Sequence, residues 1–349
     1  MKNSIFNYTL DELGQYFESI GNKKFRATQI FEWIYRHRVT SFSQMTNLGA
    51  KTIEHLEENF YFEELKVKEV FKGQDRTEKY LFELNDGHLI ETVLMRHNYG
   101  NSVCVTSQVG CKVGCKFCAS GRLGKVRNLT LSELVLQVLT IQRNLDKSGE
   151  RLSNIVVMGI GEPFDNYENL LGFLRVVNYP KGLEIGARHI TVSTSGIVPK
   201  IYEFSDFDLQ INLAISLHAP SNEIRNKIMP INNLYSLDDL IPAVKYYVEK
   251  TNRRITFEYI LLKDVNDSVA NAHQLSDLIR GINAYVNLIP YNEVPGAGFK
   301  RPTNEAMQEF FATLRKRGIN ATLRMEHGAE IDAACGQLRA QMMKRNKKA

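Results

Sequence analysis

Short apolar runs alternate with helical patterns over most of the chain, and this alternation limits the possible folds more than any other feature. Apolar periodicity predicts helices that begin at Thr130 and that cover 169–177, 237–250, 268–281 and 304–317. Repeated βα units produce parallel strands with right-handed crossovers, so the fold class is α/β. The predicted strands cover 102–109, 155–158, 189–193, 211–217, 255–262, 285–289 and 319–324.

Six such units are too few for a closed eight-stranded barrel. We therefore expect an open, partial (βα)6 barrel, with functional side chains at the C-terminal ends of its strands. A doubly wound flat sheet is the alternative. Before the barrel, residues 1–60 show helical spacing, and Asp86-Gly87 between two apolar runs predicts a β-hairpin. We expect an N-terminal α+β accessory domain at 1–96, the barrel at 97–330 and a C-terminal segment at 331–349.

The bulk composition is that of an ordinary globular protein, with 43% hydrophobic and 24% charged residues among 349. No long apolar stretch follows Met1, so we expect no signal peptide, no membrane span and a cytoplasmic protein. The net charge of +5 is modest, but basic residues cluster near the N-terminus, around the cysteines and in the tail. Such clusters suit a polyanionic partner such as nucleic acid. The N-terminal cluster includes Lys23, Lys24 and Arg26.

Four of the five cysteines lie within fifteen residues, at positions 104, 111, 115 and 118, and Cys335 stands alone. In a reducing compartment, clustered cysteines are metal ligands or catalytic groups more often than disulfides. Three thiolates in one short loop can hold three irons of a cubane cluster and leave the fourth iron open. A zinc ion with Cys104 as its fourth ligand is the alternative, although Cys104 lies inside a predicted strand.

The C-x3-C-x2-C loop, with the aromatic Phe117 before its third cysteine, resembles the radical SAM superfamily. The resemblance implies a 4Fe–4S cluster on Cys111, Cys115 and Cys118. It also implies that the open iron binds S-adenosylmethionine (SAM), which one electron from a flavodoxin-like donor cleaves to a 5′-deoxyadenosyl radical.

Five further segments resemble the RlmN/Cfr family of radical SAM enzymes, which methylate adenine in RNA. They are MGIGEP at 158–163, TVSTSG at 191–196, SLHA at 216–219, NLIPYN at 287–292 and DAACGQLR at 332–339. They occur in the family's order, and the resemblance covers nearly the whole chain. The resemblance implies that Gly161, Glu162, Ser193, Ser216, Leu217, His218 and Asn292 bind the SAM cofactor.

The same resemblance implies two SAM molecules per turnover. The first methylates Cys335, and the second supplies a radical that activates this methyl group for addition to the adenine ring. Glu91 then takes the ring proton. Cys104 attacks the sulfur of Cys335, releases the methylated RNA and leaves a disulfide.

Pro163 and Pro290 resemble the RlmN branch of the family. This branch methylates carbon 2 of an adenine in the peptidyl transferase centre of 23S rRNA, and some members also methylate tRNA. A Cfr-type enzyme, which methylates carbon 8 and confers antibiotic resistance, is the first alternative. A radical SAM enzyme with a small-molecule substrate and a zinc-bearing RNA-binding module without catalysis are two others. We expect a monomer.

Overall fold

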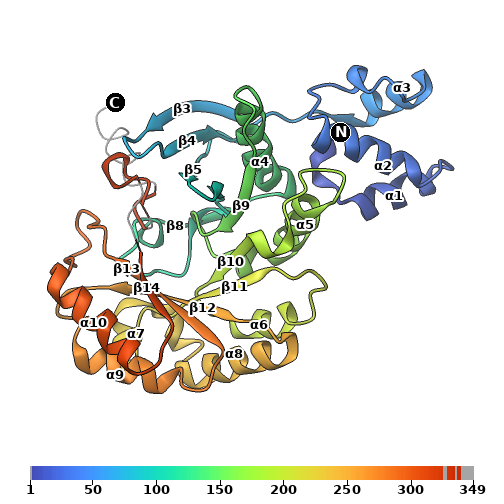
Figure 1. Cartoon of the computed structure of the whole chain (residues 1–349). Coiled ribbons are helices and arrows are strands. Elements are labelled where there is room, and N and C mark those ends of the chain that lie inside the picture. Colours follow the sequence, from blue (N-terminus) through green and yellow to red (C-terminus); the bar gives the residue numbers. More distant parts are fainter. Residues whose placement is uncertain (1, 325–327, 335, 339–349) are drawn as a thin grey trace.

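The computed structural model describes residues 2–324, 328–334 and 336–338 and is built on one large mixed sheet (Figure 1). The order of its ten strands is β14-β13-β12-β11-β10-β9-β6-β5-β4-β3. The parallel part consists of β6 (Gly100–Cys104), β9 (Leu152–Val157), β10 (Ile190–Thr194), β11 (Asn212–Ser216), β12 (Ile255–Leu261), β13 (Ala284–Pro290) and β14 (Ala321–Leu323).

Each parallel strand after β6 is added on the same side of the one before it. Because every crossover is expected to be right-handed, this order keeps the helices on one outer face of the sheet, as in a barrel. A doubly wound sheet needs a reversal of strand order, which these strands lack. The (βα)6 prediction is confirmed and its flat alternative is wrong. The crossover helices are α4 (Leu131–Asp146), α5 (Tyr167–Asn178), α6 (Val198–Phe204), α7 (Asn222–Ile228), α8 (Leu237–Thr251), α9 (Val269–Leu278) and α10 (Asn304–Lys316).

Three antiparallel strands extend this sheet beyond β6. They are β3 (Lys66–Lys72), β4 (Glu78–Glu83) and β5 (Leu89–His97), and β5 pairs directly with β6. The predicted hairpin at Asp86-Gly87 joins β4 to β5, but these strands do not form a separate small sheet. The accessory domain boundary at residue 96 therefore falls inside a continuous sheet, and it stays a prediction.

The N-terminal helices lie to one side of the sheet (Figure 1). They are α1 (Leu10–Ser19), α2 (Phe25–Phe31) and α3 (Ala50–Asn59). Thr9 and Glu12 form a capping box that satisfies the first amides of α1. A short parallel pair, β1 (Asn3–Ser4) with β2 (Phe60–Tyr61), closes this unit by joining its two ends. None of the helices in the described part of the chain combines the length and the hydrophobicity that crossing a membrane requires.

The strand predicted at 102–109 is interrupted. The sheet strand β6 ends at Cys104, and β7 (Gln108–Cys111) forms a separate hairpin with β8 (Gly124–Asn128). Between them the backbone leaves the sheet, because the amides of Ser107 and Gln108 both donate to the carbonyl of Ile160. The local sequence did not reveal this change of hydrogen-bond partner, since Ile160 lies more than fifty residues further along the chain.

Candidate active site

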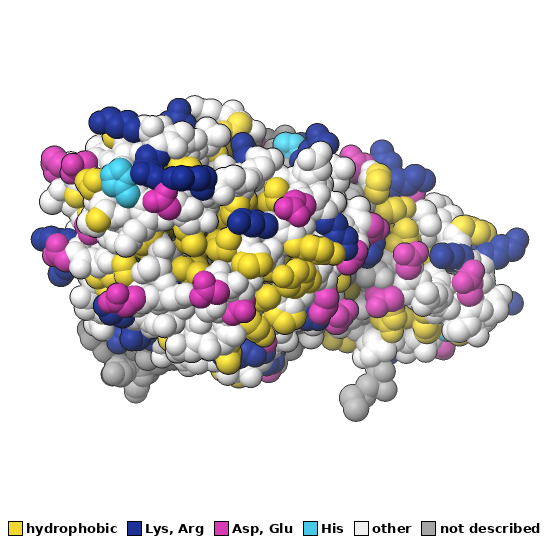
Figure 2. Space-filling view, turned by 90° about the horizontal axis from the view of Figure 1, so that it is seen from below, with side chains coloured by type: hydrophobic (Ala, Val, Ile, Leu, Met, Phe, Trp, Pro, Cys, Tyr) yellow, Lys and Arg dark blue, Asp and Glu magenta, His cyan; other side chains and the backbone are white. Residues whose placement is uncertain are grey.

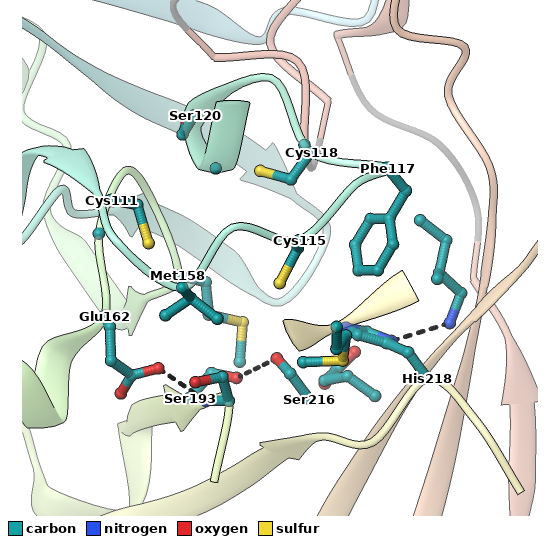
Figure 3. Close-up of a pocket in the computed structure, with 18 of the residues that line it drawn as sticks. Cys111, Cys115, Phe117, Cys118, Ser120, Met158, Glu162, Ser193, Ser216 and His218 are labelled. Atoms are coloured by element: carbon teal, nitrogen blue, oxygen red, sulfur yellow. Dashed lines mark hydrogen bonds between the residues drawn. The ribbon is translucent and has the colours of Figure 1, made fainter. Parts of the chain in front are cut away.

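The cysteine loop begins at the end of β7 and runs to a short helical turn, η4 (Ser120–Arg122). The sulfur atoms of Cys111, Cys115 and Cys118 face one pocket (Figure 3). Gly121 packs against the loop, and a Cβ atom placed on it would lie 2.9 Å from the backbone nitrogen and oxygen of Cys115. The loop is therefore tightly folded around its middle cysteine.

Burial makes these thiols poor anions unless a metal binds them. Desolvation raises the pKa of Cys111 to about 12 and that of Cys115 well above its ordinary value. A thiolate is the ligand form, so a bound metal would supply the stabilisation that the protein interior does not.

Three sulfurs on one loop, with the fourth cysteine elsewhere, fit the predicted 4Fe–4S cluster. Cys104 belongs to a different buried group, together with Val93 and Met95. In the described residues no three His, Cys, Asp or Glu side chains converge as ligands of a single metal ion. A cubane cluster does not require such convergence, because each thiolate binds its own iron.

The pocket continues from the cysteines to the C-terminal ends of β9, β10 and β11. Figure 3 shows Glu162, Ser193 and Ser216 on the wall opposite the sulfurs. The hydroxyl oxygens of Ser193 and Ser216 lie 3.3 Å apart. Gly161 also lines the pocket with φ of +115°, and a Cβ there would lie 2.6 Å from the hydroxyl of Ser107. Only glycine suits this turn.

Glu162 is held in place by donors from two chain segments. Its Oε1 accepts hydrogen bonds from Thr194 Oγ1 at 2.7 Å and from the amide of Phe164 at 3.0 Å, and its Oε2 accepts one from the amide of Ser195 at 2.7 Å. Burial raises the pKa of Glu162, while the Ser195 and Thr194 donors oppose the rise. Oε2 accepts only one of these hydrogen bonds. It therefore retains a lone pair that could accept a hydrogen bond from the amino group of a bound cofactor.

His218 lines the same pocket as a neutral imidazole. Burial, assisted by the charge of Arg225, lowers the pKa of His218 to about 3. Its Nδ1 accepts a hydrogen bond of 3.0 Å from the amide of Ile260, which assigns the ring proton to Nε2. The ring of Phe117 meets it edge-on, with centroids 5.1 Å apart. His218 can thus offer one N–H donor and an apolar face to a ligand.

Two of the predicted cofactor-binding residues lie away from this pocket wall. Leu217 is fully buried, and its carbonyl accepts a hydrogen bond from Arg225. Asn292 is nearly buried just after β13 and does not line the pocket. The structure therefore brings together Gly161, Glu162, Ser193, Ser216 and His218, and these roles remain predictions for all seven residues.

Sequence reasoning missed two buried charged residues at this site. Arg225 on α7 is fully buried, and its Nη2 donates to the carbonyl of Ser195 at 2.6 Å, so it ties the loop after β10 to the end of β11. Burial lowers the pKa of Arg225 to about 10. Glu258 on β12 lines the pocket, burial raises its pKa, and its Oε2 accepts from Asn287. The sequence did contain a signal for Glu258, because it is the single carboxylate within the apolar run 255–262.

The basic residues around the cysteine loop are largely paired, which weakens the prediction of a basic surface there. Lys112 and Lys125 both contact Asp165. Burial opposes ionisation of this carboxyl group, but the two lysines hold the pKa of Asp165 below its usual range. Arg127 bridges Asp86 and Glu133.

Lys and Arg side chains are interspersed with Asp and Glu over the face in Figure 2, and several basic side chains lie at the end formed by the N-terminal helices. At this end Lys23 and Lys24 are exposed, and Arg26 is partly exposed.

The proposed base and the proposed resolving thiol lie on one face of the sheet. Val93 on β5 pairs in register with Cys104 on β6, and Glu91 is two residues before Val93, so all three side chains point to the same side. Glu91 is only 1% exposed, which excludes a solvated strand residue. Cys104 is also buried.

The described part of the C-terminal segment covers this face. Ala333 and Leu338 pack in one apolar group with Val93 and Cys104. Cys335 itself lies outside the described residues, so its predicted role is not tested. Its described neighbours place the segment between β4–β5 and the cysteine loop.

A partial (βα)6 barrel with a three-cysteine loop and a ligand pocket at the C-terminal ends of its strands defines the radical SAM class of enzymes. Residues 105–275 match the radical SAM superfamily, and residues 3–62 match the ribosomal RNA large subunit methyltransferase N-terminal domain. The crystal structure of a radical SAM methyltransferase from Sphaerobacter thermophilus, 44% identical, superposes with a TM-score of 0.91 and covers 97% of this chain and 99% of that one.

Several relatives bear the name "Probable dual-specificity RNA methyltransferase RlmN". The protein of Geobacillus kaustophilus is 58% identical over 98% of this chain and 93% of its own length. That of Bacillus subtilis is 56% identical over 97% and 93%, and that of Enterococcus faecalis 56% over 99% and 98%. The chain belongs to the RlmN family of radical SAM RNA methyltransferases, a class that uses SAM and a 4Fe–4S cluster. The predicted family, fold and enzyme class are confirmed.

Proposed function

We propose that this chain methylates carbon 2 of an adenine in 23S rRNA and of an adenine in tRNA, using a methyl group carried by Cys335. The names of the relatives, which specify RNA and a dual specificity, support this substrate class. The match of residues 3–62 to a domain of large-subunit rRNA methyltransferases supports the ribosomal substrate.

The chemistry of the target explains why an ordinary methyl transfer does not suffice. Carbon 2 of adenine is electron-poor and does not attack a sulfonium methyl group. When bound, the cluster supplies the electron that cleaves SAM to the radical needed for addition to such a carbon. The pocket holds the residues suited to orient that cofactor, with Glu162 toward its amino group and Ser193 and Ser216 beside it.

Three residues of this chain act on the methyl group and the ring. Cys335 accepts a methyl group from a first SAM by displacement. This methyl group would lose one hydrogen atom to the radical derived from a second SAM, and its carbon would then bond to the adenine ring. Glu91 accepts the ring proton as a general base. Cys104 then attacks the sulfur of Cys335, which releases methylated RNA and leaves a disulfide. An external thiol reductant resets the pair, and a flavodoxin-like protein supplies electrons to the cluster.

The observation that carries this proposal is the shared sheet face of Glu91 and Cys104. Both are buried, and both lie beneath the C-terminal segment whose Ala333 and Leu338 pack against Val93 and Cys104. The base must reach the ring proton and the resolving thiol must reach the sulfur of the same protein–RNA adduct, so both groups need to lie close together on one covered face.

The test is mass spectrometry of nucleosides from rRNA and tRNA of cells with and without this protein. We expect 2-methyladenosine in both RNAs only when the active protein is present, and none when Cys335→Ala replaces it. Appearance of 8-methyladenosine would assign the chain to the Cfr type. Absence of any methyladenosine difference would overturn the proposal.

We further propose that residues 1–96 bind the RNA and that the protein acts as a monomer. The adenine must leave its stack to reach the pocket, so the rest of the RNA needs a separate binding surface. The exposed Lys23 and Lys24 at the tip of the N-terminal helices support that role.

A further inference from the structure

Lys79 on β4 is a fully buried lysine. The residue as a whole and its side chain alone are each only 1% exposed. Lysine is almost never buried to this degree without a specific partner, because removing an ammonium group from water is costly. The contacts of this residue therefore indicate what its burial achieves.

The ammonium group of Lys79 joins two parts of the chain. Its Nζ lies 3.3 Å from Oε1 of Glu91, whose side chain is 2% exposed. The same Nζ donates a hydrogen bond of 3.2 Å to the backbone carbonyl of Asp332, more than 250 residues away in sequence. The ring of Phe71 covers it, with the nitrogen 5.0 Å from the ring centroid.

The strand register places Lys79 in line with the proposed resolving thiol. Lys79 pairs with Val93 across β4 and β5, and Val93 pairs with Cys104 across β5 and β6. Residues paired in this way point to the same face of a sheet. Lys79, Glu91 and Cys104 therefore share the face that the described C-terminal residues Ala333 and Leu338 cover.

A buried ion pair is not an efficient way to stabilise a fold. Well-packed apolar side chains of similar size are often equally stable, whereas the loss of one partner leaves an uncompensated buried charge. The pair does, however, impose a fixed geometry on the groups that it joins. Here it joins the proposed proton acceptor to the segment that carries residue 335.

We propose that Lys79 is a positioning residue, which orients the carboxylate of Glu91 and anchors the C-terminal segment through Asp332 so that the base faces the ring proton. This inference rests on the proposed function. Lys79 itself exchanges no proton and touches no substrate, and its effect passes through Glu91.

A double-mutant cycle tests this assignment. Lys79→Met, Glu91→Gln and the double variant are purified with cluster, their Cys335 S-methylation is quantified by peptide mass spectrometry, and single-turnover RNA methylation is measured on the methylated fraction. Glu91→Gln should slow this step by about 100-fold or more. Lys79→Met should slow it by about 10- to 100-fold and accumulate a protein–RNA adduct, because the base is misplaced. The double variant should be no slower than Glu91→Gln alone.

Two further variants separate positioning from general stability. Lys79→Arg, which keeps the cation, should recover most of the rate and remove the adduct. Lys68→Met on β3 removes an exposed lysine that pairs with Glu83 at 3.2 Å, and it should behave like the wild type. Lys68→Met is the matched control for loss of a lysine from the same sheet.

Two outcomes would overturn this inference but leave the proposed function intact. One is a double variant whose loss of rate is the product of the two single losses, and the other is a Lys79→Met protein with wild-type rate and no adduct. If Lys79→Met does not fold, the double variant carries the test, because its neutral pair leaves no buried charge. Equal rates of the double variant and Glu91→Gln support the inference, and a further tenfold loss overturns it. Absence of S-methylcysteine from the wild-type protein would instead overturn the proposed function, and this inference with it.

Discussion

The backbone amide of Ala119 donates a hydrogen bond of 2.8 Å to the carbonyl of Gly336. Ala119 follows the third cysteine of the loop, and Gly336 follows Cys335 in the sequence. The hydroxyl of Ser120 donates a second bond, of 3.3 Å, to the carbonyl of Leu338. The C-terminal segment is thereby attached directly to the loop that we expect to carry the cluster.

This attachment predicts a functional sensitivity at Gly336. Its φ of +83° is a left-handed conformation, and a substitution by alanine there costs about 1–2 kcal/mol of backbone strain. We expect Gly336→Ala to slow S-methylation of Cys335 several-fold, as measured by peptide mass spectrometry. Gly318→Ala is the matched control, with φ of +77° and nothing within 4 Å of its Cβ. Equal S-methylation in both variants would refute the prediction.

Replacement of Cys335 should remove activity but not the cluster. Cys335→Ala is expected to fold, to bind iron and sulfide at wild-type levels and to form no methylated RNA, because only the methyl acceptor is lost. Visible absorbance and iron analysis report the cluster, and nucleoside mass spectrometry reports the product. RNA methylation that persists in this variant would contradict the assignment of Cys335 as the methyl acceptor.

Replacement of Cys104 should stop the reaction one step later. Without a resolving thiol, Cys104→Ala is expected to accumulate RNA covalently linked to Cys335, since the thioether sulfur has no attacking partner. A gel shift that resists denaturation and disappears on nuclease digestion detects the adduct. Turnover without any adduct would remove the resolving role from Cys104.

His218 should make the protein sensitive to acid. Because burial lowers its folded-state pKa to about 3 from an unfolded value of 6.5, stability is fully present above pH 6.5 and is lost as the pH falls toward 3. The expected loss between pH 7 and pH 5 is about 2 kcal/mol of unfolding free energy.

The matched variant for this prediction is His218→Asn. Asparagine can keep the acceptor for the amide of Ile260 and tolerates the φ of +57° at this position, but it does not titrate. Denaturant unfolding at both pH values should show a smaller pH dependence in the variant. An equal loss of unfolding free energy between pH 7 and pH 5 in both proteins would contradict the assignment of a neutral His218.

The N-terminal lysines should contribute to RNA affinity. Lys24 contacts Asp11 at 3.6 Å, but both side chains are more than half exposed, so this surface pair is weak and leaves Lys24 available to phosphate. Lys23→Ala with Lys24→Ala should weaken RNA binding and reduce the slope of log Kd against log salt by about 1 to 2. Lys245→Ala, an exposed lysine on α8, is the control. An unchanged slope would refute the role.

Local patterns in the sequence were sufficient to predict the class of fold, and they also suggested the cysteine ligands of the cluster. Hydrophobic periodicity is a property of neighbouring residues, so the alternation of strands and helices was predictable. The spacing of Cys111, Cys115 and Cys118 within one short loop indicated a shared metal cluster for the same reason. The resemblance of five separate segments added the family.

The tertiary structure decided which distant residues meet. The row Lys79, Val93 and Cys104 depends on strand register, and register is determined by pairing between strands rather than within one. The burial that makes His218 neutral and gives Arg225 its bridging role arises from elements far apart in sequence. The break of the strand predicted at 102–109 has the same origin, because its new partner, Ile160, lies in another βα unit. Such pairings depend on the packing of the whole chain, so local sequence does not reveal them.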